Sequence, residues 1–187
     1  MSAVEYSLIF LSIVISYVVT VSMVSWGKLI KYYDFEKFSL DYFLWSVFLF
    51  LYLLFIWFWT FSYHLVYLDS YLWFTLLLIR PVLIYFCLEI LIPEIYDGCN
   101  YKEHFELVKR KFFIILSTLW CFEIALSLLM GHSFNSTRGG LYLICLPISL
   151  YLVFVKNKKI HRILSIITFL VMLFAILGSM VDQSFRG

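Results

Sequence analysis

Arg80 and Glu123 are the residues of this chain best placed to do chemistry, because each lies within an apolar segment long enough to cross a bilayer. Arg80 falls near the middle of residues 75–94 (TLLLIRPVLIYFCLEILIPE), and Pro81 follows it at once. A charged side chain at the centre of a bilayer costs at least about 2.5–3.5 kcal/mol, so such a residue is a functional candidate by default. Pro81 adds a second cost, because it frees the backbone carbonyl of Leu77, which a nearby guanidinium could satisfy.

Helix geometry predicts that Arg80 and Glu123 meet. At about 1.5 Å per residue, Arg80 lies roughly 15 Å below one membrane surface and Glu123 roughly 18 Å from the other. In a hydrocarbon core about 30 Å thick both are near mid-depth, and consecutive spans usually pack as neighbours. An ion pair between them would reduce both costs. It could be a structural pair that fixes how two helices dock, or a gate, proton site or anion-binding group facing a wet cavity.

Glu89 is a secondary candidate on the same segment as Arg80. Glu89 is nine residues after Arg80, which is roughly 900° or two and a half turns of helix, so it points to the opposite side, about 13.5 Å further along the axis. On a straight helix the two side chains therefore cannot share one site. We expect Glu89 to reach Lys109 or Arg162 at the membrane surface, or to be hydrated there.

The remaining candidates lack the partners that chemistry would need. His64 and Asp69 could form a surface acid–base couple, although a histidine in an interfacial aromatic belt is the simpler interpretation. His104, flanked by Glu103 and Glu106, makes a poor metal set. The four cysteines form no C-x-x-C pair, and the chain has no nucleotide-binding, hydrolase or zinc-protease motif. The sequence therefore predicts neither an enzyme nor a metal or other cofactor.

These residues must be positioned by helices that cross a membrane. The chain is 64% hydrophobic and 14% charged, against roughly 45–50% and about 25% in soluble domains. Its apolar residues fall in long runs that a soluble fold could not cover with polar surface. No cleavage site follows the first run, so we expect it to be retained as a helix. We predict an all-α, polytopic membrane protein, a single transmembrane domain over residues 1–187, with six transmembrane helices at about 6–26, 42–62, 70–92, 112–130, 141–155 and 163–181.

The basic residues predict how these helices are oriented. Eleven of the fourteen Lys and Arg residues fall in the loops after the first, third and fifth spans. Because these loops are short, the positive-inside rule places them in the cytoplasm and both termini on the non-cytoplasmic side. The eleven residues are Lys28, Lys31, Lys37, Lys102, Lys109, Arg110, Lys111, Lys156, Lys158, Lys159 and Arg162.

Two of these loops could contact a cytoplasmic partner or lipid. Residues 101–111 have apolar side chains at helical spacing, which predicts a short amphipathic helix along the inner surface, with a Glu106–Arg110 pair. An ordinary solvated extension of the fourth span is the simpler interpretation. Residues 156–162 (KNKKIHR) form a basic turn that could bind anionic lipid. The candidate contact residues are Lys102, Phe105, Lys109, Arg110, Lys111, Lys156, Lys158, Lys159 and Arg162.

Two further features bear on how the helices pack. Ser12, Ser16 and Thr20 lie four residues apart on one face of the first span, a spacing that lets a second helix approach closely. We expect that helix to belong to the same chain rather than to a second copy. The fifth span is short and contains Pro147, which can mark a broken helix at a binding site or be a tolerated kink.

Several segments of the first two-thirds of the chain match a known pattern: VEYSLIFLSIVISY, GKLIKYY, LWSVFLFLYLLFIWFWTF, LIRPVLIYFCLEILIPE and RKFF. Through them, residues 1–131 resemble a widespread group of small bacterial multi-span membrane proteins of unassigned function. The chain departs from the usual pattern in having no glycine within its first span. The resemblance implies a multi-span topology and a bacterial origin, and it assigns no site.

Two functions are compatible with these features. The first is a channel or carrier for an ion or small solute, homo-oligomeric because six short spans enclose little volume, with Arg80 and Glu123 lining or gating its path. The second is a non-catalytic membrane-embedded partner subunit or effector, for example in stress or phage defence, that acts through its cytoplasmic loops. We expect a multi-pass protein of the bacterial inner membrane, surrounded by lipid. The basic residues are spread over three loops, which argues against nucleic acid as a partner.

Overall fold

Six helices make up most of the chain that the computed structural model describes, namely residues 3–32, 34–63, 70–93, 100–131 and 137–184. Each matches one predicted span, and the described residues contain no strand. Five are long and apolar enough to cross a membrane, and the fifth in order is a shorter apolar helix. The predicted polytopic helical fold is therefore confirmed. The helices are α1 (Ala3–Lys31), α2 (Leu40–Tyr63), α3 (Tyr71–Leu91), α4 (Tyr101–Leu129), α5 (Thr137–Phe154) and α6 (Lys158–Ser184).

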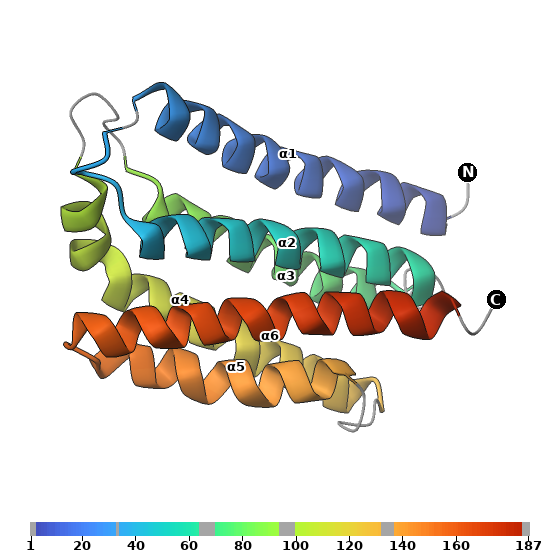
Figure 1. The fold of residues 1–187 in the computed structure, drawn as a ribbon. Helices are drawn as coiled ribbons and strands as arrows, with labels where there is room; N and C mark the ends of the chain where they lie inside the picture. Colours follow the sequence, from blue (N-terminus) through green and yellow to red (C-terminus); the bar gives the residue numbers. More distant parts are fainter. Residues whose placement is uncertain (1–2, 33, 64–69, 94–99, 132–136, 185–187) are drawn as a thin grey trace.

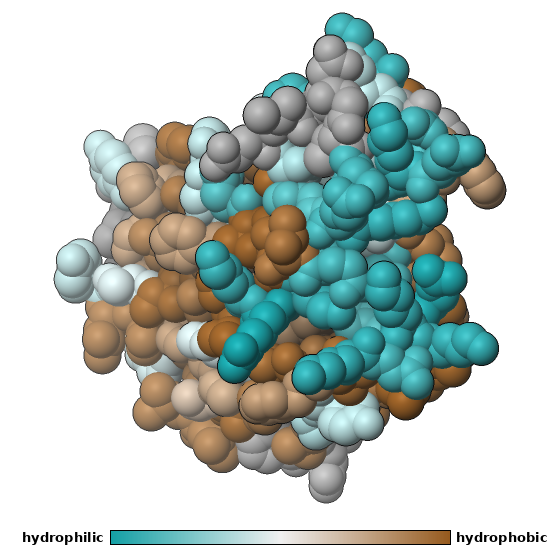
Figure 2. Space-filling model, turned by 90° about the vertical axis from the view of Figure 1, so that its left-hand side faces the viewer, coloured by the Kyte–Doolittle hydropathy of each residue, from teal (hydrophilic) through white to brown (hydrophobic). Residues whose placement is uncertain are grey.

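Consecutive helices run in opposite directions, and the two termini lie at the same end of the bundle (Figure 1). The other end holds the C-terminus of α1, the N-termini of α2 and α4, and the turn between α5 and α6. Figure 2 faces this end, where hydrophilic side chains gather. We call it the basic end and define it as residues 28–41, 100–111 and 155–162, which carry the eleven basic residues of the predicted inner loops. The side of the membrane that it faces stays a prediction.

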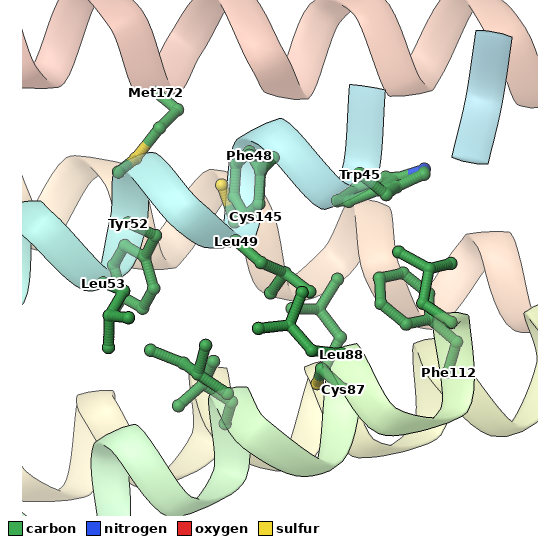
Figure 3. Close-up of a cluster of buried hydrophobic side chains, with 14 of the residues drawn as sticks. Trp45, Phe48, Leu49, Tyr52, Leu53, Cys87, Leu88, Phe112, Cys145 and Met172 are labelled. Atoms are coloured by element: carbon green, nitrogen blue, oxygen red, sulfur yellow. The ribbon is translucent and has the colours of Figure 1, made fainter. Parts of the chain in front are cut away.

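Helix α2 lies at the centre of the hydrophobic core because its aromatic side chains pack against four other helices. Figure 3 shows its Trp45, Phe48 and Tyr52 among side chains from α3, α4, α5 and α6. The Trp45 and Phe113 rings are 5.0 Å apart and nearly perpendicular, and the Tyr52 and Trp120 rings are 4.9 Å apart. Lipid tails are as apolar as these side chains, so close packing, rather than escape from water, holds such helices together.

Helix α1 lies at the periphery of the bundle (Figure 1). Near the basic end it is joined to α2 by two hydrogen bonds: Ser25 and Tyr42 share one of 2.9 Å, and Trp26 donates to Ser46 Oγ over 3.0 Å. Ser16 and Thr20 are exposed, so the prediction that this face packs on another helix of the chain is wrong for these two residues. Hydroxyls can occupy a face toward lipid because they bond to their own helix, as Thr20 does to the Ser16 carbonyl over 2.8 Å.

Residues 101–111 are the first three turns of α4 rather than a separate surface helix. The Asn100 side chain caps them by accepting hydrogen bonds from the backbone N–H groups of Lys102 and Glu103. The predicted Glu106–Arg110 pair is absent: Glu106 instead pairs with Lys109 at 2.6 Å. Both i+3 and i+4 neighbours face Glu106 on a helix, and here the i+3 neighbour is half-buried whereas Arg110 points to solvent.

Both intramembrane prolines lie inside continuous helices. Pro81 is buried in α3, and Pro147 is on an exposed face of α5. The alternative of a helix broken at Pro147 is therefore wrong, and α5 tolerates this proline within a continuous helix. On a face toward lipid its ring needs no room within the bundle.

Candidate functional site

Arg80 and Glu123 form a two-pronged ion pair in the interior of the bundle, which confirms the predicted contact. Arg80 Nε donates to Glu123 Oε1 over 2.8 Å, and Nη2 donates to Oε2 over 2.5 Å. The exposed fraction is 3% for Arg80 and 0% for Glu123. Two parallel charge-assisted hydrogen bonds are the strongest arrangement available to these side chains, and it offsets the removal of both charges from water.

The antiparallel course of α3 and α4 brings these two residues together. Arg80 is nine residues from the start of α3, and Glu123 is six residues before the end of α4. The start of α3 and the end of α4 lie at the same end of the bundle. Measured from that end, Arg80 is about 14 Å along its helix and Glu123 about 9 Å along its own. The long arginine side chain covers the remaining difference in depth, so the pair forms well inside the apolar part of the helices.

Aromatic side chains lie close to the ion pair. Some buried polar atoms in this region have no hydrogen-bond partner. The Arg80 guanidinium lies over the Trp59 ring, 5.9 Å from its centre, a favourable cation–π contact. The hydroxyls of Tyr52 and Tyr142 interact with the pair electrostatically. Among the described residues, Arg80 Nη1 and Trp120 Nε1 have no hydrogen-bond acceptor although both are buried. Buried donors are rarely left unpaired in folded proteins, so each points to an acceptor that binds there.

Arg80 does not help to satisfy the carbonyl that Pro81 frees, contrary to prediction. Two of its three guanidinium nitrogens donate to Glu123, and the third, Nη1, has no partner among the described residues. The carboxylate on the facing helix provides a stronger, charged acceptor than the Leu77 carbonyl.

Glu89 lies apart from the pair, as its position along the helix predicts. Its side chain is exposed at the basic-end half of α3. The predicted contacts with Lys109 and Arg162 are absent, because those side chains pair with Glu106 and Asp41 instead. The exposure of Glu89 is consistent with the alternative, a carboxylate hydrated at the membrane surface, which stays a prediction.

The predicted contact residues at the basic end differ in exposure. Lys102, Arg110, Lys111, Lys156, Lys158, Lys159 and Arg162 are exposed, and Lys109 is half-buried. Phe105 is wrong as a surface contact: it is 3% exposed and packs edge-on against the His161 ring, with centres 5.5 Å apart. Phe105 and Phe113, two turns apart on α4, both contact the His161 ring, so this side of α4 faces the bundle rather than lipid or a partner. His64 and Asp69 lie outside the described residues.

Sequence analysis missed a second polar cluster, formed by Asp41 and His161. His161 Nδ1 is 3.7 Å from Asp41 Oδ1, and Arg162 Nε is 3.8 Å from Asp41 Oδ2. His161 is 3% exposed, and its neighbour Ser165 accepts a 3.0 Å hydrogen bond from the indole of Trp45. A signal for this contact was present, because Asp41 and His161 lie one and two residues before the start of a predicted span, at the same predicted side of the membrane.

The described residues contain no group of three His, Cys, Asp or Glu side chains that could hold a metal ion. Large apolar side chains cover the outside of the helices, for example Ile13 at 62% and Phe174 at 71% exposed. An apolar surface of this kind around five membrane-length helices is typical of a protein embedded in lipid. Fold and site together define a multi-pass helical membrane protein with a buried ion pair.

Comparisons with protein-family models, with curated proteins and with solved structures find no match. The resemblance of residues 1–131 to small bacterial membrane proteins therefore remains an expectation.

Proposed function

We propose that this protein is a small channel or carrier for an ion or solute, in which the Arg80–Glu123 pair is the gate or the binding group. The unpaired donor of the pair itself, Arg80 Nη1, carries this proposal, together with the unpaired Trp120 Nε1 one turn before Glu123 on α4. Around an ion pair with a purely structural role, every buried donor is expected to have a hydrogen-bond acceptor, because each unpaired buried donor costs about 1–3 kcal/mol. Donors that await an acceptor at mid-depth favour a site that water, an anion or a solute oxygen enters.

The location of the pair also supports transport. Its charges come from adjacent helices, so a small rotation of α3 against α4 would separate them and expose both to an incoming ligand. Since six helices leave little room for a pore within one chain, we propose a homo-oligomer in which such a rotation opens a path. Bacterial inner membrane is the expected location.

Ion flux through purified protein in liposomes tests this proposal. We compare the unchanged protein with Arg80→Gln and Glu123→Gln, and use Glu89→Gln as the matched control because Glu89 is an exposed carboxylate on the same segment. A gate predicts higher flux when the pair is broken, whereas a binding group predicts lower flux. The control should match the unchanged protein. Absence of flux under every ionic condition would contradict transport.

A charge swap separates transport from folding. Arg80→Glu combined with Glu123→Arg keeps an ion pair in the same place and should restore folding, measured by the melting temperature in detergent. If flux stays altered in the refolded double variant, the pair acts in transport. If flux returns to normal together with stability, the pair has a structural role only.

A second candidate function is a non-catalytic membrane-embedded partner subunit or effector. Exposed apolar side chains among the charges of the basic end favour it: Phe35 is 79% and Leu107 80% exposed. Such side chains beside lysines and arginines could bind a cytoplasmic protein. This candidate predicts no flux, and it predicts that Leu107→Ser abolishes capture of a partner from a membrane extract while leaving the fold intact.

A further inference from the structure

A pocket of about 100 Å³ opens at the basic end between the first turns of α2, α4 and α6. Its charged and titratable side chains are Asp41, Lys102, Glu106, Lys158, His161 and Arg162. Lys102 Nζ already donates to the Glu36 carbonyl. Since a water molecule needs only about 10–15 Å³ measured in this way, the pocket has room for a small polar group. The Arg80–Glu123 site lies elsewhere, deep in the bundle, so the pocket is independent of the proposed transport function.

The ion pairs around this pocket are too long to be hydrogen bonds. Lys158 Nζ is 3.7 Å from Glu106 Oε1, His161 Nδ1 is 3.7 Å from Asp41 Oδ1, and Arg162 Nε is 3.8 Å from Asp41 Oδ2. Hydrogen bonds of this type measure about 2.7–3.2 Å. The cations therefore retain free donors, and the carboxylates retain free acceptor positions.

Two buried polar atoms at this pocket have no hydrogen-bond partner among the described residues. They are Asp41 Oδ1, which needs a donor, and His161 Nε2, on a side chain that is 3% exposed. Lys158 and Arg162 are exposed cations at the edge of the pocket, where they can donate to an anionic group. Three helix N-termini also converge here, and their dipoles favour negative charge. The complementary ligand thus carries both an anionic group and N–H donors.

The pocket lies at the level where phospholipid headgroups lie. The membrane-length segments of α2 and α6 begin at Leu40 and Lys158, and both starts border the pocket. On α6, Ile160 and Ile163 are exposed within one turn of the pocket-lining residues, where acyl chains could cover them. A ligand with a polar head and apolar tails fits this boundary better than a soluble ion does.

We propose that this pocket binds the headgroup of a phospholipid that carries a primary amine. Lys158 and Arg162 hold the phosphate, and Asp41 accepts a hydrogen bond from the ammonium group. His161 supplies its unpaired nitrogen to the same headgroup. The mixed charge of the pocket distinguishes this ligand from an anionic lipid such as phosphatidylglycerol, which has no cationic group to pair with Asp41, so phosphatidylglycerol should bind more weakly than phosphatidylethanolamine.

Lipid binding to the purified protein in detergent tests the proposal. Native mass spectrometry measures retention of phosphatidylethanolamine, its N-methyl and N,N-dimethyl derivatives, phosphatidylcholine and phosphatidylglycerol. Affinity should fall as N–H donors are replaced by methyl groups and be about tenfold weaker for phosphatidylcholine, the factor expected for one hydrogen bond to a charged group. Equal retention of the ethanolamine and choline lipids would overturn the proposal. This lipid series needs no variant, so a folding defect cannot confuse it.

Matched variants locate the site. Asp41→Asn and Arg162→Gln should each weaken phosphatidylethanolamine binding by about tenfold. Glu103→Gln and Lys31→Gln remove a carboxylate and a cation from exposed positions of the same end that do not line the pocket, and should change nothing. If all four variants lose binding equally, general surface charge rather than the pocket holds the lipid, and the proposal fails.

Soluble phosphoethanolamine distinguishes the two possible sources of the headgroup. The free compound should compete only weakly with the lipid, since it lacks the acyl chains that the exposed isoleucines contact. Competition at the same concentration as the lipid would assign the pocket to a soluble ligand and overturn the membrane part of the proposal.

Discussion

Arg80 donates two hydrogen bonds to Glu123 in the buried interior of the bundle, and the energetics of the pair follow from that burial. The attraction within a buried ion pair recovers little more than the cost of removing two charges from water, so the pair adds little net stability. Removing one partner alone is strongly destabilising, because it leaves the other charge buried without a counter-charge. Pro81 directly after Arg80 holds that turn of α3 at a fixed φ. These residues therefore determine how α3 and α4 meet, whatever else they do.

At the residue scale, we expect Glu123→Gln to destabilise the fold by about 3–5 kcal/mol, because it leaves the Arg80 guanidinium buried without a counter-charge. Replacing both partners by apolar residues, Arg80→Met with Glu123→Leu, should recover most of this loss. Denaturant unfolding in mixed micelles measures both. Glu89→Gln, at an exposed position, should stay within about 0.5 kcal/mol of the unchanged protein. Equal stability of the two single variants would show that the pair contributes nothing to folding.

At the scale of elements, α2 is the helix on which the others are assembled. Its Trp45 packs against Phe113 of α4 at 5.0 Å and donates to Ser165 of α6 over 3.0 Å. Ser165 in turn donates to the His161 carbonyl of its own helix over 3.0 Å. One indole thus fixes the position of α2 relative to two helices distant in sequence.

Ser165→Ala tests this contact. It leaves the Trp45 indole N–H buried without an acceptor, and we expect a loss of about 1–3 kcal/mol in the free energy of unfolding. Ser16→Ala, which removes the same hydroxyl from an exposed face of α1, should have almost no effect. If the two alanine variants unfold alike, the hydrogen bond between α2 and α6 does not hold these helices together.

At the scale of the whole molecule, the concentration of basic residues at one end of the bundle predicts its orientation. In a cysteine-free background, Lys156→Cys and Ser70→Cys place exposed thiols at opposite ends. In intact cells, an impermeant maleimide should label position 70 and label position 156 only after the membrane is broken, because positive loops stay in the cytoplasm. The reverse pattern would invert the topology.

The sequence by itself determined the number, direction and approximate ends of the helices, since each depends on an apolar run and on charges that flank it. It also determined the Arg80–Glu123 contact, because two buried opposite charges at similar depth on adjacent spans have few alternatives. These are properties of position along the chain, and 1.5 Å per residue is enough to derive them, although several helices extend beyond their apolar runs, α4 by three turns.

Only the tertiary structure decided which face of each helix points inward. A helix that is apolar all round carries no periodic signal for its rotation. For that reason the exposure of Ser16 differs from prediction. Phe105 and Glu106 lie in a segment with a clear apolar stripe, and there only the packing decided that this stripe faces the bundle and that Glu106 pairs with Lys109. The Asp41–His161 cluster arises from the same cause: α2 and α6 are far apart in sequence, and packing around Trp45, not any local pattern, brings their first turns together.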